Sequence, residues 1–289
     1  MKFEYNVHMQ IIDQTIQNVF QTKQYSLTKL DKGISNHNYL LCVDQKKYIV
    51  RATKSEHSAL HLQFEKEKEV LLHVKNLDVE TLYFDTINGI KITSFVPHIS
   101  EFHETADPKK YAKAALLLKK LHTKNVEVSF FFDPFFKLEQ YKNAIKSPII
   151  HFDQEEKILN AVKEIYIPDT LCHNDVVQGN ILFSPQREYL IDWEYGAMND
   201  RRFDIASFFS ENQIMDPESR NQFYAAYHLP LSTTEVCLFE AMADILWGYW
   251  GNMLYEKRKE LIYKQIATEK MEHYHHFSLH SLSSFIHTL

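Results

Sequence analysis

A short segment near residue 180 constrains the fold more than any other part of the chain. Two strand-like apolar runs, residues 181–183 and 189–191, are separated by five residues that include Ser, Pro and Gln. Two such runs joined by a short polar connection predict a β-hairpin. The hairpin would bring Asp192, which follows the second run, opposite Asn180, which precedes the first.

Polar residues around this hairpin occur in the order that phosphoryl transfer requires. An aspartate must orient the substrate hydroxyl and accept its proton, while an asparagine and a second aspartate hold Mg²⁺ on the nucleotide phosphates. Asp175, Asn180 and Asp192 offer these groups in that order, and Glu194 could add another of the oxygen ligands that Mg²⁺ prefers. Any one of them alone would be interpreted as a turn residue. Together they predict the active site of an ATP-dependent small-molecule kinase.

A cation follows a β-rich run upstream of this site. Arg51 comes directly after Tyr-Ile-Val at 48–50, where a kinase fold places the basic residue that pairs with nucleotide phosphates and with a helix glutamate. Residues 61–75 have a moderately helical pattern and contain Glu65, Glu67 and Glu69. One glutamate of this helix should meet Arg51, and the alternative is a solvated charged face.

Residues 31–40 lie between two strand-like runs, which predicts a turn whose backbone N–H groups face phosphate oxygens. The segment contains Asn36 and His37 but only one glycine, Gly33, so it is not a Walker A loop. Taken alone, an ordinary turn is the simpler interpretation.

Two tryptophans lie three residues apart in a long helical stretch. The stretch starts with the capping box Ser232 to Glu235 and runs to about residue 256. Trp247 and Trp250 share a helix face, so their indoles can form adjoining walls. Such walls suit a quaternary ammonium group, which is recognised through cation–π attraction. The alternative is that both side chains belong to the core.

These motifs resemble the choline/ethanolamine kinase family, and most closely its bacterial LicA-type choline kinases, within the aminoglycoside phosphotransferase and protein-kinase-like superfamily. The resemblance is carried by residues 173–182 (HNDVVQGNIL), 190–195 (LIDWEY) and 203–206, and by the WGYW run at 247–250. It covers about residues 25 to 255. The catalytic-loop part is shared with other small-molecule kinases, whereas the tryptophan pair is the more choline-specific element.

The resemblance implies a role for each matching residue. Asp175 would be the catalytic base and contact the substrate hydroxyl, and His173 would brace the catalytic loop. The remaining roles fall into four groups: Asn180, Asp192 and Glu194 would hold Mg²⁺; Tyr195, Trp247, Trp250 and Glu211 would contact the substrate; Arg51 and Glu65 would form the phosphate-side ion pair, with Asn36 and His37 in the phosphate loop; Phe95 and Val96 would lie beside adenine.

Length and composition agree with a two-lobed α+β enzyme of the protein-kinase-like type. A chain of 289 residues with 45% hydrophobic content can form two cores. A nucleotide-binding lobe with a small antiparallel sheet is expected at 1–95, and a larger, mostly helical catalytic lobe at 96–289, with a hinge at about 95–100. A helix is expected to open at Asp107 and Pro108 and to continue to His122.

The remaining properties restrict partners and location. The net charge of −6 argues against a nucleic-acid partner, which would need a basic face. The three cysteines are widely spaced and odd in number, so a disulfide framework is not expected and a reducing, cytoplasmic location is. Cys172 is expected to be a small buried residue. The sequence contains no run of about 18 apolar residues, so no membrane-spanning segment is expected. The oligomeric state cannot be inferred.

The sequence therefore predicts a kinase that transfers the γ-phosphoryl group of ATP to choline with Mg²⁺ as cofactor. An enzyme of the same fold could act on ethanolamine, thiamine, methylthioribose or an aminoglycoside. A nucleotide-binding pseudokinase that serves as a scaffold is the alternative from another class, although Asp175, Asn180 and Asp192 are all present.

Overall fold

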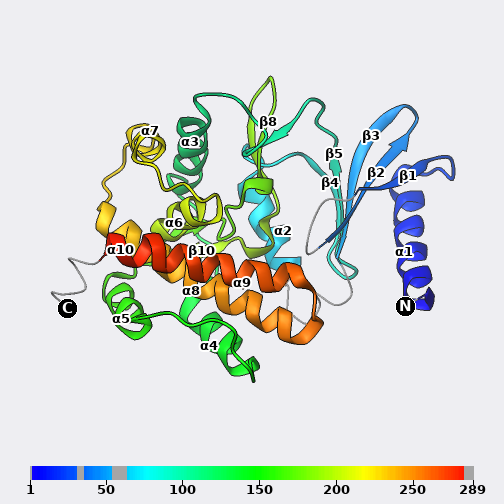
Figure 1. Cartoon of the computed structure of the whole chain (residues 1–289). Coiled ribbons are helices and arrows are strands. Elements are labelled where there is room, and N and C mark those ends of the chain that lie inside the picture. The colour runs from blue at the N-terminus through cyan, green and yellow to red at the C-terminus, as the bar shows by residue number, and fades with distance from the viewer. Residues whose placement is uncertain (1, 31–35, 54–63, 283–289) are drawn as a thin grey trace. The chain divides into compact units, whose positions relative to one another are not determined.

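The computed structural model describes residues 2–30, 36–53 and 64–282, and its contacts divide the chain into two units (Figure 1). The first unit comprises Met1–Ile99 and Ser184–Glu194, and the second comprises Ser100–Phe183 and Tyr195–Leu289. The chain thus returns to the first unit after residue 183, whereas the sequence predicted one continuous division at residue 95.

An antiparallel sheet of five strands organises the first unit, with the order β1-β2-β3-β5-β4. The strands are β1 Ser26–Leu30, β2 Asn36–Val43, β3 Lys46–Thr53, β4 Thr81–Asp85 and β5 Ile90–Ser94. A two-residue turn joins β2 to β3, and its residues Asp44 and Gln45 have φ values of 48° and 64°. This left-handed conformation matches the twist of the flanking strands, which sets the register of the hairpin.

Helix α1 (Lys2–Phe20) supplies one side of the hydrophobic core of this unit. Ile12 and Ile16 are one helical turn apart and fully buried against the sheet. On β2 the buried residues Tyr39, Leu41 and Val43 alternate, as they must when one face of a strand is covered. The sequence analysis had made no prediction for α1.

The returning segment 184–194 attaches to the loop that follows α2 (Phe64–His73). Arg187 donates hydrogen bonds of 2.9 Å to the carbonyl oxygens of Asn76 and Asp78. The backbone N–H of Leu190, on β9 (Glu188–Leu190), donates to the carbonyl of Leu77 at 2.9 Å. These bonds explain why Asp192 and Glu194 belong to the first unit. Residues 61–63 of the predicted helix and 31–35 of the predicted turn lie outside the described residues.

The second unit is mostly helical. Its elements are β6 Ser100–Glu101, α3 Lys110–His122, α4 Pro134–Ala144, α5 Glu155–Ile165, β7 Thr170–Cys172, η2 Gln178–Asn180, β8 Ile181–Phe183, β10 Ala197–Asn199, α6 Arg201–Glu211, α7 Pro217–Tyr227, α8 Thr233–Arg258, α9 Leu261–His273, η4 Tyr274–Ser278 and α10 Leu279–Ser281; η3 Trp193–Tyr195 lies where the chain passes back from the first unit. Strands β7 and β10 pair antiparallel, as do β6 and β8.

Capping residues begin several of these helices. Ser232 accepts a hydrogen bond from the backbone N–H of Glu235, so the predicted cap of α8 is confirmed. The predicted N-cap of α3, Asp107, lies two residues before the observed N-cap, Lys109. Asp107 accepts the N–H of Lys109 within a turn, and the helix begins at Lys110.

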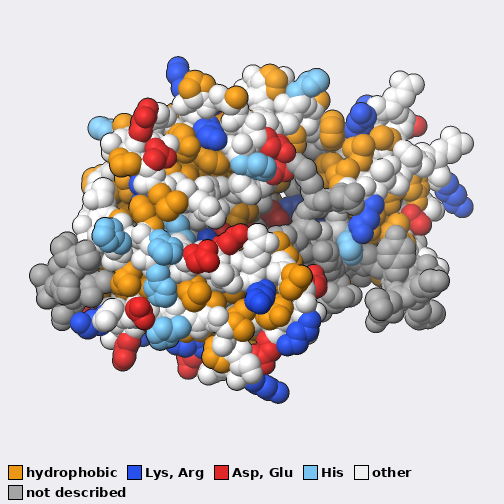
Figure 2. Space-filling view, in the orientation of Figure 1, with side chains coloured by type: hydrophobic (Ala, Val, Ile, Leu, Met, Phe, Trp, Pro, Cys, Tyr) orange, Lys and Arg blue, Asp and Glu red, His pale blue; other side chains and the backbone are white. Residues whose placement is uncertain are grey.

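Surface properties are mixed. The face shown in Figure 2 carries acidic and basic side chains interspersed with hydrophobic ones over its described part. Within residues 2–30, 36–53 and 64–282, no helix combines the length and the apolar character that crossing a membrane requires.

Helix α8 packs closely against α9, which runs beside it (Figure 1). Gly251 on α8 allows this approach. A Cβ atom at this position would lie 2.9 Å from the carbonyl oxygen of Tyr263 and 3.0 Å from the backbone nitrogen of Ala267. Both are backbone atoms of α9, which cannot rotate away as a side chain could.

We therefore expect Gly251→Ala to destabilise the protein. The overpacking cost, about 1–3 kcal/mol, should exceed the gain in helix propensity, about 1 kcal/mol. Chemical denaturation measures the difference in the free energy of unfolding. Gly179→Ala is the control, because its nearest foreign atom would be 3.8 Å away at Glu101. Equal stabilities of the two variants would contradict the role of Gly251.

Candidate active site

A buried cluster of charges forms beneath the sheet of the first unit. Arg51 on β3 and Lys91 on β5 are register partners on adjacent strands, and both are buried. The Glu67 carboxylate of α2 lies between them, 2.5 Å from the Arg51 guanidinium and 2.8 Å from the Lys91 ammonium. Burial opposes ionisation of Glu67, but the two cations lower its pKa to about 2. The two cations therefore favour the ionised form of the Glu67 carboxyl group.

Glu67 takes the place that the sequence analysis assigned to Glu65. Residues two apart on a helix point to different faces, and Glu65 is exposed on α2, where it accepts a hydrogen bond from the Thr86 hydroxyl. The prediction of Glu65 as the partner of Arg51 was wrong. The buried positions Glu67, Val70 and Leu71 have helical spacing, so the apolar period of α2 carried a signal that was missed.

Arg51 also links the cluster to the predicted metal-binding residues of the same unit. It donates to the Asp192 carboxylate at 2.5 Å. Asp192 has a φ of 67°, an uncommon conformation for a residue with a side chain. The buried Asn36 amide donates to Glu194 at 3.3 Å. The structure thus brings Arg51 to Asp192, 141 positions later in the chain, and Asn36 to Glu194, 158 positions later.

Other predicted nucleotide-side residues surround the same sheet. His37 lies on β2 opposite Ala52. Phe95 and Val96 follow β5 and are half-buried, and the Lys47 ammonium lies 5.5 Å from the centre of the Phe95 ring. Their predicted contacts with phosphate and adenine stay predictions.

The catalytic loop lies in the second unit, between β7 and β8. The Asn180 side-chain amide donates to the Asp175 carbonyl at 2.9 Å and to its carboxylate at 3.1 Å. The loop therefore brings these two side chains together. His173 is fully buried, and its Nδ1 accepts the backbone N–H of Asp175 at 3.3 Å. This contact fits a bracing role for His173. The predicted approach of Asp192 to Asn180 would join the two units and stays a prediction.

A buried carboxylate that the sequence analysis did not single out holds this loop. Asp204 on α6 is fully buried and accepts the backbone N–H groups of His173 at 2.8 Å and Asn174 at 2.6 Å. Nε2 of His122 lies 3.0 Å from the same carboxylate. Burial raises the pKa of the neighbouring Cys172 thiol well above its usual value, as expected for an unreactive core residue.

Aromatic rings gather beside the loop. The Trp247 ring lies 5.7 Å from that of Tyr195, 6.0 Å from that of Trp250 and 6.3 Å from that of Phe132, measured between centroids. The two indoles are nearly perpendicular, at 88°, and so form adjoining walls. We call Phe132, Tyr195, Trp247 and Trp250 the aromatic cluster. No motif in the sequence indicated that Phe132 belongs to this cluster.

The aromatic cluster is attached to the catalytic loop within the same unit. The Asn174 side-chain amide donates to the Tyr195 carbonyl at 2.9 Å, and its oxygen accepts from Asn199 at 2.7 Å. Asn174 itself has a φ of 69°. Asn174, which directly precedes Asp175, thus fixes the backbone of Tyr195, and the Tyr195 ring contacts Trp247.

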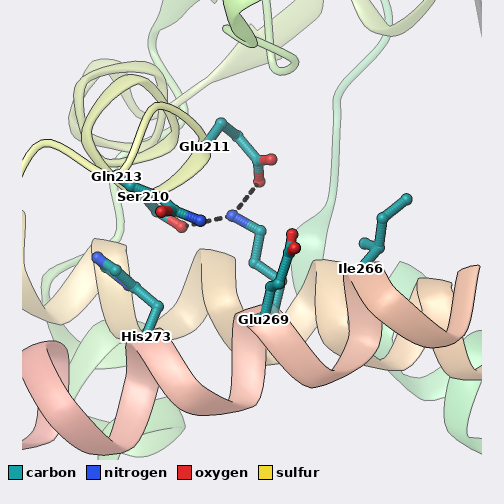
Figure 3. Close-up of a pocket in the computed structure, with 7 residues that line it drawn as sticks. Ser210, Glu211, Gln213, Ile266, Glu269 and His273 are labelled. Atoms are coloured by element: carbon teal, nitrogen blue, oxygen red, sulfur yellow. Dashed lines mark hydrogen bonds and ion pairs between the residues drawn. The ribbon is translucent and has the colours of Figure 1, made fainter. Parts of the chain in front are cut away.

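Glu211 already has a cationic partner. Its carboxylate lies 2.7 Å from the Lys270 ammonium of α9, which also donates to the Ser210 hydroxyl at 2.8 Å. Figure 3 shows Glu211 and Ser210 facing Ile266, Glu269 and His273 across a small pocket. The predicted contact of Glu211 with substrate stays a prediction.

Asp78, which interacts with Lys91 and Glu67 of the charge cluster, has a strongly shifted pKa. It is buried, and one of its carboxylate oxygens accepts the backbone N–H of Val79 at 2.7 Å. Burial raises the pKa of Asp78 to about 7, although Lys91 opposes this shift. The folded protein therefore holds this proton over a pH range in which the unfolded chain has lost it.

A stability difference that depends on pH follows. Because the pKa is raised on folding, the contribution of Asp78 to stability is full below the unfolded pKa of about 4 and is lost as the pH rises to 7. Asp78→Asn cannot ionise, so the variant should gain stability relative to the wild type over this interval. Thermal unfolding at several pH values measures it, and a constant difference would contradict the assignment.

Comparisons with known proteins agree with this geometry. The family described as phosphotransferase enzyme family matches residues 26–237, well over half of the chain. Protein LicA of Haemophilus influenzae is 27% identical over 195 residues, which cover 63% of this chain and 57% of that protein.

Solved structures give the same result. The crystal structure of choline kinase LicA from Streptococcus pneumoniae has a TM-score of 0.75 at 28% identity, covering 92% of this chain and 99% of that chain. A crystal structure of LicA in complex with AMP has a TM-score of 0.74 at 28% identity, covering 92% and 98% of the two chains. The predicted protein-kinase-like α+β fold is confirmed, and the chain belongs to the phosphotransferase enzyme family as a small-molecule kinase.

Proposed function

We propose that the protein is an ATP-dependent choline kinase, which transfers the γ-phosphoryl group of Mg-ATP to the choline hydroxyl and yields phosphocholine and ADP. One observation carries the proposal. The hydrogen bond from Asn174 to the Tyr195 carbonyl ties the loop that bears Asp175 to a cluster of four aromatic rings. A general base and a surface for a methylated ammonium are thereby held in one unit.

Asp175 is the proposed base. The side-chain amide of Asn180 contacts its carboxylate and orients it, and the buried loop backbone limits its movement. A positioned carboxylate can accept the proton of the choline hydroxyl as the oxygen attacks the γ-phosphorus. Orientation of the hydroxyl is the main contribution that a protein makes to such a reaction.

The aromatic cluster supports choline as the acceptor. A quaternary ammonium cannot donate hydrogen bonds and is held by ring faces, each worth about 0.5–2 kcal/mol. Ethanolamine would require hydrogen-bond acceptors around its ammonium group. The indole N–H is the polar group of the Trp247 and Trp250 side chains. These groups donate and do not accept.

The first unit supplies the proposed nucleotide contacts. Arg51 would neutralise phosphate charge, with Glu67 and Lys91 fixing its position. The carboxylates of Asp192 and Glu194 are the hard oxygen donors that suit Mg²⁺, and Asp192 is partly exposed. They are the proposed first-unit ligands of this ion, which would offset the negative charge of the phosphates when bound.

The proposal is tested by ADP release from Mg-ATP with choline, ethanolamine, thiamine, methylthioribose and an aminoglycoside as acceptors. Strong stimulation by choline is expected. Stimulation by another acceptor alone would keep the kinase and reject choline. Absence of stimulation by every acceptor would favour a nucleotide-binding scaffold.

Asp175→Asn should lower turnover by about 10²–10⁴-fold, because the amide cannot accept the hydroxyl proton. Affinity for ATP should change little. Initial rates and nucleotide binding by calorimetry give the two quantities. Asp169→Asn is the matched control, an exposed aspartate just before β7. Turnover retained by Asp175→Asn would refute the assignment.

Variants of two neighbouring glutamates distinguish loss of the buried ion pair from the general effect of removing a negative charge from α2. Glu67→Gln leaves Arg51 and Lys91 without their buried anion, and should raise KM for ATP by at least about tenfold and lower Tm. Glu65→Gln removes the same charge from the exposed face of α2 and should change neither. The steady-state ATP dependence of both variants decides between them. An equal rise in KM for the two would show that Arg51 is not positioned through Glu67.

A further inference from the structure

One cation of the chain itself lies on the aromatic cluster. The Lys137 ammonium, from helix α4, is 5.0 Å from the centre of the Phe132 ring and 5.4 Å from that of the Tyr195 ring. Both distances fall within the range of a cation–π contact. The two rings also contact one another, with centroids 6.1 Å apart. Lys137 therefore occupies ring faces of the kind that a substrate ammonium would use.

Helix α4 is held in place independently of the Lys137 side chain. The backbone of Lys137 is fixed by the hydrogen bond of its N–H to the Asp133 carbonyl, near the start of α4. Its side chain is half-buried, and the neighbouring Leu138 anchors the helix in the core. A lysine side chain is a flexible four-carbon stem with a compact charge. It can leave the rings without unfolding the helix.

We propose that Lys137 is a built-in competitor for the aromatic cluster, which a quaternary ammonium substrate must displace before it binds. A substrate ammonium on the same rings would lie close to the Lys137 ammonium, and like charges repel strongly in a poorly hydrated site. The substrate and Lys137 therefore cannot share the faces of Phe132 and Tyr195. Lys137 thereby weakens binding of choline and keeps the rings covered when no substrate is present. This inference rests on the proposed function in placing choline at the cluster.

A second lysine of the same helix provides a control. The Lys142 ammonium lies 5.2 Å from the centre of the Tyr249 ring, which is outside the aromatic cluster. It is also paired with the Glu155 carboxylate at 2.6 Å, and the Tyr249 hydroxyl donates to Glu155 at 2.9 Å. Lys142 therefore has the same charge, helix and type of ring contact as Lys137, but its ring contact lies outside the aromatic cluster.

The test compares Lys137→Met, Lys137→Arg and Lys142→Met. Removal of the competing cation should tighten binding of tetramethylammonium to Lys137→Met, measured by tryptophan fluorescence, and lower KM for choline, each between about twofold and thirtyfold. KM for ATP should not change. Lys137→Arg keeps a cation over the rings and should stay near the wild type, as should Lys142→Met.

The outcomes separate this inference from the proposed function. If the wild type phosphorylates choline and Lys137→Met has an unchanged or higher KM, the competitor role is wrong and the kinase assignment stands. If no variant uses choline but Lys137→Met binds tetramethylammonium more tightly, the competitor role stands and choline is rejected. Equal tightening by Lys142→Met would reduce the effect to net charge and overturn the inference.

Discussion

The Asp204 carboxylate is the interaction on which the catalytic loop depends. It is removed from water and accepts the N–H groups of two consecutive loop residues, His173 and Asn174, while His122 binds it from α3. Hydrogen bonds to a buried charge are stronger than neutral ones, and loss of the charge would leave two buried donors without a partner. A residue of α6 therefore fixes the backbone of the two residues that directly precede Asp175.

The first unit solves a different electrostatic problem. Two cations from adjacent strands face each other, and Glu67 neutralises them from α2. Arg51 uses a second part of its guanidinium to hold Asp192, so the cluster reaches the returning segment 184–194. A guanidinium can bind two carboxylates at once because its donors form a rigid planar fork. The same geometry suits a phosphate, which supports Arg51 as a nucleotide contact.

The second unit joins its polar and aromatic parts through Asn174. One face of this side chain holds the Tyr195 backbone, and the other accepts from Asn199. Trp247 then contacts Tyr195, and Gly248 and Gly251 on the same helix let Phe152 and α9 pack closely against α8. The proposed base and the proposed acceptor-binding rings therefore belong to one connected set of contacts. The Lys137 ammonium lies over two rings of this set, Phe132 and Tyr195, and it is the cation that we propose a substrate must displace.

The sequence by itself determined the kinase class, the order of the catalytic residues and the adjoining tryptophans. These features rest on local spacing: a loop of six residues brings Asp175 to Asn180, and a helix places residues three apart on one face. Only the tertiary structure decided that Glu67 rather than Glu65 meets Arg51, that Asp204 anchors the loop, and that segment 184–194 belongs with the N-terminal unit. Each of these depends on which face of an element is buried against a partner distant in sequence. Local patterns only partly encode that choice, because burial is a property of the assembled core.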